Sequence, residues 1–202
     1  MKTVMKTAAL TATVLAMAGC AVNSSVPIAS RDTPLEAARS GNGVQQQSPA
    51  YRVDSVTVLV PETLRVSEAN TYYPNADIVW RGDAPGNRWA QVQAIFEEAI
   101  GRSRSHLTEG QPADLEVEVM RFHSLTDKTR YTLGGVHSIK FKLTLRDPQS
   151  GEILEQRVEK ADLKAYGGSK AVAMEVQGMG QKVRITQHLA DTFVKELSGH
   201  PA

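Results

Sequence analysis

Two histidines and a tyrosine are the side chains of this 202-residue chain best suited to chemistry. His123 ends one predicted strand, and His137 follows the run that begins at Tyr131 and contains Gly134-Gly135. At one end of a sheet these imidazoles could meet and, with Tyr131, bind a small ligand or act as a general base. Two imidazole nitrogens without a nearby carboxylate make a poor metal site, so we expect no metal. The interpretation we favour is that the glycines bend a strand and that His137 is a hydrogen-bonded core residue.

A second cluster is aromatic and cationic, and lies between the first predicted strand and the first predicted helix. It comprises Tyr72-Tyr73-Pro74 and the segment from Ile78 to Asp83, which contains Trp80 and Arg81. Tyrosine, tryptophan and arginine often anchor protein interfaces, so these four residues are candidate partner-binding residues. The alternative, which we favour, is a lid folded over the sheet, with Trp80 in the core and Arg81 paired to Asp83.

A third segment, Tyr166 to Gly180, is rich in glycine and small residues and contains two methionines. It is typical of a mobile loop, although such a loop can also order on a partner. Its Gly-x-Gly is weak support for phosphate binding without the strand and helix of a phosphate loop.

Composition and motifs argue against several classes of function. The chain has 23 basic and 22 acidic residues and no run of like charge, so we expect no nucleic-acid partner. The sequence signatures of serine hydrolases, zinc proteases, dithiol oxidoreductases and phosphate-loop enzymes are absent, and no cofactor is expected. An enzyme assembled from scattered residues stays open, but the balance favours a protein that is not one.

The single cysteine, Cys20, ends an export signal. Lys2 and Lys6 precede a small or apolar run that ends Met17-Ala18-Gly19-Cys20. This stretch resembles a bacterial lipoprotein signal, which implies removal of residues 1–19, acylation of Cys20 and attachment to a membrane through the lipid. Ala21 follows the cysteine where Asp would favour the inner membrane, so the resemblance implies the outer membrane, periplasmic face. An ordinary secretory signal and an uncleaved anchor are the alternatives.

The elements that must position the candidate residues follow from periodicity. Residues 20–50 are rich in Ser, Gly, Asn and Gln and predict a flexible tether, and residues 51–198 predict one globular domain. Helical spacing of apolar residues predicts two helices, Arg88–Ser103, capped by Asn87, and Gln181–Leu197. Extended, apolar or alternating runs predict four strands: Val53–Val60, Leu115–Val119, Ile139–Arg146 and Ile153–Leu163. Their order predicts an α+β fold, a mostly antiparallel sheet of about four strands with two helices packed on one face.

The stretches around Tyr73-Pro74, Asp77 to Asp83 and Ala90 to Glu98 resemble an uncharacterised lipoprotein family of alphaproteobacteria. More loosely, the order of helices and strands is similar to envelope-assembly lipoproteins and to auxiliary lipoproteins of lipid transporters. Both resemblances imply a membrane-anchored periplasmic protein that binds another envelope protein, and neither implies a catalytic residue. There are two alternatives. One is a small-ligand binder or hydrolase using His123, Tyr131 and His137, and the other is a lipoprotein that tethers the membrane to the cell wall.

Overall fold

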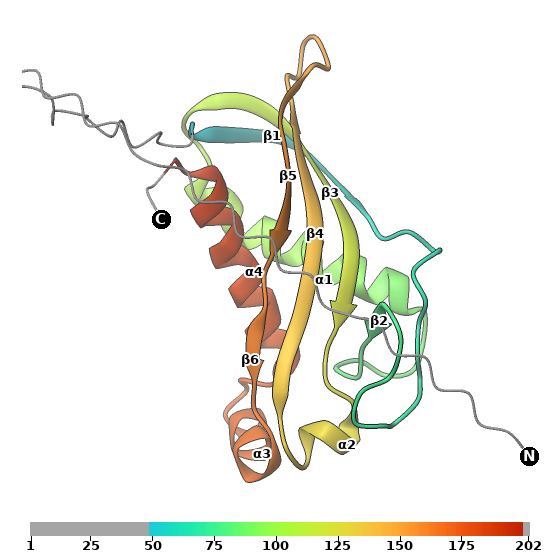
Figure 1. Cartoon of the computed structure of the whole chain (residues 1–202). Helices are drawn as coiled ribbons and strands as arrows, with labels where there is room; N and C mark the ends of the chain where they lie inside the picture. The colour runs from blue at the N-terminus through green and yellow to red at the C-terminus, as the bar shows by residue number, and fades with distance from the viewer. Residues whose placement is uncertain (1–48, 200–202) are drawn as a thin grey trace, which may run out of the picture. The chain divides into compact units, whose positions relative to one another are not determined.

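The computed structural model describes residues 49–199, which hold six strands and four helices. Cys20, the predicted signal peptide and the predicted tether as far as residue 48 lie outside the described residues. Figure 1 shows the elements in chain order: β1 (Tyr51–Leu59), β2 (Ile78–Val79), α1 (Arg88–Ser103), a 3₁₀ turn (Arg104–His106), β3 (Gln111–His123), α2 (Asp127–Arg130), β4 (Gly135–Arg146), β5 (Ile153–Lys160), β6 (Leu163–Ala165), α3 (Gly168–Val176) and α4 (Gln181–Leu197).

The sheet is mixed, with the strand order β1-β3-β4-β5 and two short additions, β2 beside β3 and β6 beside β4. The α+β class is confirmed, but the predicted strand number and the mostly antiparallel character are wrong in detail. Both β1 and β2 run parallel to β3, whereas β3, β4, β5 and β6 pair antiparallel. The parallel pair follows from α1, because a helical crossover returns the chain to the same end of the sheet.

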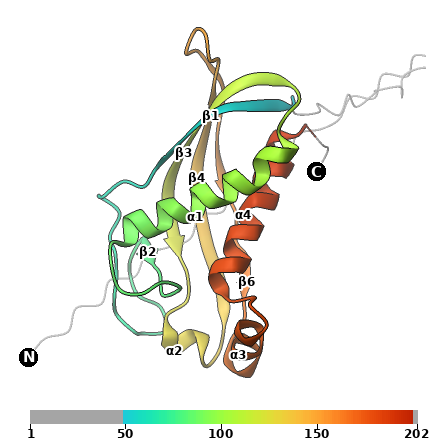
Figure 2. The ribbon, with the colours of Figure 1, turned by 180° about the vertical axis from the view of Figure 1, so that it is seen from behind.

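Helices α1 and α4 cover the same face of the sheet, as Figure 2 shows and as the sequence predicts. Both begin and end at the predicted residues, and the Asn87 side chain caps α1 by accepting a hydrogen bond from the Ala90 amide at 3.0 Å. Four phenylalanines from both helices and from β3 and β4 meet in the core, with Phe96 and Phe141 5.4 Å apart in an edge arrangement. Truncating one such ring costs about 3–5 kcal/mol.

Three short elements, β6, α2 and α3, have no counterpart among the predicted elements, whereas β2 forms within the short extended segment that the sequence predicts at Ile78-Val79-Trp80. Strands β2 and β6 and helix α2 have two to four residues, too few to establish a period. Helix α3 corrects the prediction of a loop from Tyr166 to Gly180, because nine residues of that segment are helical. Figures 1 and 2 place α2 and α3 at the same end of the domain, where Arg130 forms an ion pair with Glu175.

The other face of the sheet has no helix on it among the described residues and carries charged side chains. Glu118 pairs with Lys142 across β3 and β4, and Glu116 pairs with Arg146 at 3.0 Å. The sequence predicts that Glu116 and Glu118 face Lys140 and Lys142, and the register brings one of those lysines to a carboxylate. We call this surface the open face.

Candidate functional site

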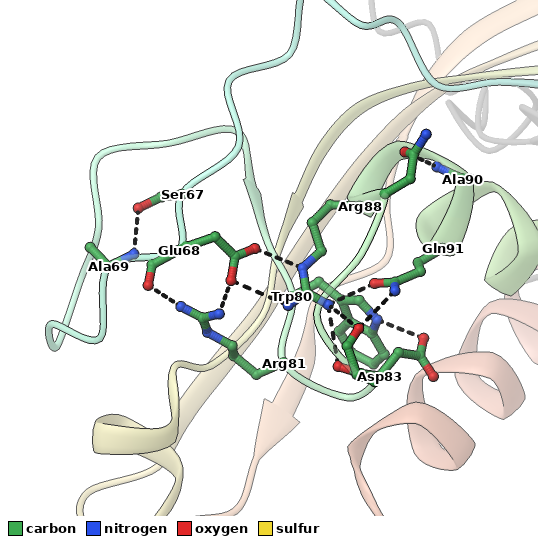
Figure 3. Close-up of polar contacts among 11 residues, drawn as sticks. Ser67, Glu68, Ala69, Trp80, Arg81, Asp83, Arg88, Ala90 and Gln91 are labelled. Atoms are coloured by element: carbon green, nitrogen blue, oxygen red, sulfur yellow. Dashed lines mark hydrogen bonds and ion pairs between the residues drawn. The ribbon is translucent and has the colours of Figure 1, made fainter.

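The long connection between β1 and α1, residues 60–87, is held by a network of polar side chains around Arg88 (Figure 3). Arg88 is 2% exposed, and its guanidinium donates to Glu68 at 2.7 Å, to Gln91 at 2.7 Å and to two backbone carbonyls, those of Asp83 and Ala84. Arg81 also pairs with Glu68. A buried guanidinium is tolerated when its donors are satisfied, so this network fixes the path of the connection.

Trp80 lies in the core and is fully buried. Its ring packs edge-on against Phe122 at 5.5 Å, and its indole N–H donates to Asp83 at 2.8 Å. Burial acts to raise the pKa of Asp83, but hydrogen bonds from Lys182 and Trp80 outweigh it and the pKa is lowered. Of the four candidate partner-binding residues, Trp80 therefore lies below the surface, and Arg81 pairs with Glu68 rather than with the expected Asp83.

Tyr72 and Tyr73, the other two, lie on the surface with exposed fractions of 50% and 72%. Tyr73 is nevertheless fixed: its ring stacks on His123 with centroids 4.6 Å apart, and its hydroxyl accepts a hydrogen bond from Arg121 at 2.8 Å. The loop backbone is also fixed, because the Thr129 hydroxyl donates a hydrogen bond to the carbonyl of Tyr72 at 2.9 Å.

His123 supports this loop from the sheet. Its Nε2 lies 3.0 Å from the carbonyl oxygen of Pro74, which can only accept, so Nε2 carries a proton. Burial lowers the pKa of His123 below its ordinary value, although the Pro74 hydrogen bond opposes the shift. His123 is therefore neutral at pH 7 and acts as a platform under Tyr73.

These side chains line a groove of about 500 Å³ at one end of the open face, which we call the tyrosine groove. Its rim is formed by four exposed side chains, Tyr72, Tyr73, Leu133 and Val136. Leu133 is 78% exposed and Val136 is 52% exposed. The lining residues come from the long connection, the end of β3 and the two residues after it, α2, the turn before β4, the first residues of β4, and the β5–β6 turn: Tyr72, Tyr73, His123, Ser124, Leu125, Thr129, Leu133, Gly134, Gly135, Val136, Ser138 and Asp162.

Positive charge continues from the groove along the open face. Ser138, which lines the groove, is two residues before Lys140, and Lys140 is paired in register with Arg121 on β3 and with Lys160 on β5. Three cations thus occupy one cross-strand row. Neither lysine forms an ion pair within residues 49–199, and like charges directly opposite each other destabilise a sheet. We call Arg121, Lys140 and Lys160 the cationic row.

The structure separates the three residues of the predicted histidine and tyrosine cluster. His123 pairs in register with Ser138, so it points to the open face, whereas the neighbouring His137 points to the face covered by helices. Tyr131 is half exposed, and the Arg130 guanidinium lies 5.2 Å from its ring. The expectation that the two imidazoles meet is wrong, because adjacent strand residues point to opposite faces.

His137 is a hydrogen-bonded core residue, as the favoured interpretation predicts. Its Nδ1 lies 2.8 Å from the Ser124 hydroxyl, and Ser124 donates to the Gln181 side chain at 3.1 Å. Ser124, His137 and Gln181 thus form one chain of buried, hydrogen-bonded side chains. Burial, with Arg184 and Arg130 nearby, lowers the pKa of His137 to about 3.

Tyr72, Tyr73 and His123 are recognisable in the sequence, but the way they combine is not. Arg88, Ser138, Asp162 and the cationic row were not singled out. Only the row had a visible signal, because two predicted neighbouring strands each place a lysine on the polar phase. Within the described residues no group of three potential metal ligands comes together, and none of the helices there is long and apolar enough to cross a bilayer.

The chain resembles known proteins at two levels, a sequence family and the folds of solved structures. No curated protein matches the chain. Three solved structures are similar: a candidate lipoprotein from Caulobacter crescentus CB15 (15% identity, 57% of this chain and 83% of that chain, TM-score 0.34), a DUF330 protein from Xanthomonas campestris (13%, 77% and 90%, 0.41) and the PelC dodecamer from Paraburkholderia phytofirmans (11%, 75% and 92%, 0.37). A family of unknown function, DUF6778, matches residues 51–202, which include the tyrosine groove. The chain belongs to the DUF6778 family.

Proposed function

We propose that this protein is a lipid-anchored protein of the bacterial envelope whose domain binds another envelope protein in the tyrosine groove. The observation that carries the proposal is Tyr73, which is 72% exposed and yet held by His123 and Arg121. A rigid aromatic side chain loses little entropy when a partner covers it, so it is suited to anchor an interface.

The groove and the cationic row together define the chemistry of the partner. An apolar side chain of the partner fits between Tyr72, Tyr73 and Val136, where it would cover exposed apolar surface. Acidic groups next to that side chain would then face Lys140 and Lys160, which have no carboxylate of their own within the described domain. Such a partner relieves the repulsion between the two lysines, and its charge favours the encounter.

A small apolar ligand is the second candidate, since a volume of about 500 Å³ is in the range of ligand pockets. Hydrolysis is poorly supported. The Ser124–His137 pair resembles a nucleophile and its base, but both residues are buried. A histidine with a pKa of about 3 is also a weak base at neutral pH.

The anchor and the compartment are part of the proposal. They are supported by the positive segment, apolar run and small residues that lead to Cys20, and by Ala21 after it, which together favour the periplasmic face of the outer membrane. Intact mass of protein extracted with detergent from the native envelope tests this part. We expect loss of residues 1–19 and added acyl mass that Cys20→Ser removes; a full-length, unacylated chain would overturn it.

Crosslinking in cells tests the groove. A photo-reactive phenylalanine analogue replaces Tyr72 or Val136 in the groove, and Ile153, at the end of β5 far from Lys160, serves as the control. The control side chain is 47% exposed, close to the 50% and 52% of the two groove positions. We expect one protein adduct of defined mass from both groove positions and none from β5.

The outcomes separate the candidates. The same adduct from groove and control positions would mean non-specific capture and would contradict the proposal. An adduct of small mass at the groove alone would replace the protein partner with a small ligand. The Tyr73→Ala exchange should also abolish the groove adduct, because it removes the anchor while Tyr72 and Val136 stay in place.

A further inference from the structure

Helix α3 exposes apolar side chains on the side that faces away from the domain. Ala171 is its one buried residue, whereas Val172 and Val176 are 45% and 84% exposed and Met179, just beyond the helix, is 39% exposed. Val172 and Val176 are four residues apart and so share one side of the helix. A surface helix normally presents charged side chains to water, and here Lys170 is the one charge on the exposed side.

Positive charge lies beside the start of this helix, next to Tyr166. The ammonium of Lys170 and the guanidinium of Arg184 lie 4.2 and 4.0 Å from the ring centre of Tyr166, and Arg184 also donates to the backbone carbonyl of Lys164. No carboxylate within residues 49–199 pairs with Lys170 or Arg184. From Leu163 to Arg184 the chain has one acidic residue, Glu175, which is paired with Arg130.

The position and length of α3 fit a surface contact. The helix lies at one end of the domain beside α2 (Figures 1 and 2), so its exposed side is not shielded by the sheet. Nine residues give a length of about 13 Å, far below the roughly 30 Å needed to cross a bilayer. A short helix with an apolar side and flanking cations is suited to lie in the plane of a membrane interface.

We propose that α3 is a membrane-contact helix that rests on the surface of an anionic lipid bilayer. Val172, Val176 and Met179 enter the headgroup region, and Lys170 and Arg184 face the lipid phosphates. Val172 and Val176, the two most exposed of these side chains, protrude rather than line a hollow, and the charge beside them that has no carboxylate partner is positive, which is complementary to anionic lipid. This site is separate from the tyrosine groove and goes beyond the proposed function.

Vesicle sedimentation tests the proposal on residues 21–202, which retain the whole described domain and lack Cys20. The vesicles contain either seven parts phosphatidylethanolamine to three parts phosphatidylglycerol, or phosphatidylcholine alone. We expect binding to the anionic vesicles and at least tenfold weaker binding to phosphatidylcholine. The double variant V172Q/V176Q should weaken anionic binding about tenfold, and K170Q about fivefold, since each cation near the surface contributes a factor of that order.

The controls separate lipid contact from loss of structure and from the groove. Gln favours helix more than Val, so V172Q/V176Q should keep the circular dichroism and melting temperature of the unaltered chain. V158Q changes a valine of similar exposure on β5 and should bind vesicles unchanged, as should Y73A. Equal binding to both vesicle types, or unchanged binding by V172Q/V176Q, overturns the proposal. A dimer that V172Q/V176Q dissolves, with no vesicle binding, would assign the helix face to a second copy and would also overturn it.

Discussion

Replacement of Glu68 by Gln should destabilise the domain by about 2 kcal/mol, because it leaves the buried Arg88 guanidinium without a carboxylate. Breaking a fully buried ion pair costs about 3–5 kcal/mol. Arg88 is 2% exposed, but the Glu68 side chain is 52% exposed, so water screens part of the interaction and lowers the expected cost. Arg81 loses the same partner, which adds a smaller amount.

The matched control is Glu98→Gln, which removes an exposed carboxylate from its i,i+4 pair with Arg102. That pair should contribute less than about 0.5 kcal/mol. Urea unfolding followed by circular dichroism measures both free energies of unfolding, and hydrogen exchange at residues 66–80 reports whether the loop opens. If E68Q unfolds within about 0.5 kcal/mol of E98Q, the Arg88 network does not hold the connection as we describe.

The same contact predicts a pH dependence. The hydrogen bond from Arg88 lowers the pKa of Glu68, against the opposing effect of burial. A carboxylate with a lowered pKa in the folded state stabilises the fold above its unfolded pKa, and this stabilisation is lost as the pH falls through the folded value. The difference in unfolding free energy between the unaltered chain and E68Q should therefore shrink as the pH falls below about 4.5.

Three further predictions test other parts of the structure. The pKa of His137 is lowered to about 3, so below pH 6.5 the unfolded chain binds a proton that the folded chain does not. The free energy of unfolding should therefore decrease as the pH is lowered from 6 to 3, by up to about 1.4 kcal/mol per pH unit. In urea titrations H137Q should flatten this slope, and an unchanged slope would contradict the burial of a neutral His137. A Cβ on Gly167 would collide with the backbone of Leu133 and Gly134, so G167A should destabilise the domain by more than about 2 kcal/mol. Gly101 in α1 has open space around it, so G101A should stabilise the domain by about 0.5–1 kcal/mol. Similar melting temperatures for the two variants would refute the close approach at Gly167. In K160E the new carboxylate should pair with Lys140, which should raise the free energy of unfolding by about 0.5 kcal/mol and weaken partner binding. If stability and partner affinity instead both rise or both fall, the cationic row is not part of the interface.

The parts of the fold that repeat with a regular period were predictable from the sequence. The apolar spacing of α1 and α4 and the alternation of β4 gave their bounds to within a few residues. Helix α3 was not predictable in this way, because its buried side is a single alanine and its valines face solvent. Its apolar residues therefore mark a surface rather than a core, and no sequence window distinguishes the two.

The candidate site shows the same division. Tyr73 and His123 are recognisable by type, but they are 50 residues apart, and their stacking depends on a loop path set by Arg88 and Glu68. The two histidines could not be placed on a common face without the strand register, which puts His123 opposite Ser138 and so turns it away from His137. Register depends on side chains from several strands at once, and single-strand patterns do not fix it.

The affinity of the purified chain for the protein captured at the groove tests the central claim most directly. Isothermal titration would compare the unaltered chain with Tyr73→Ala and with Ile153→Ala, two exchanges of exposed side chains on different parts of the domain. We expect Tyr73→Ala to raise Kd about 30-fold, as for loss of an aromatic anchor, and Ile153→Ala to leave Kd unchanged. Equal Kd values for all three chains would contradict the tyrosine groove as the binding site.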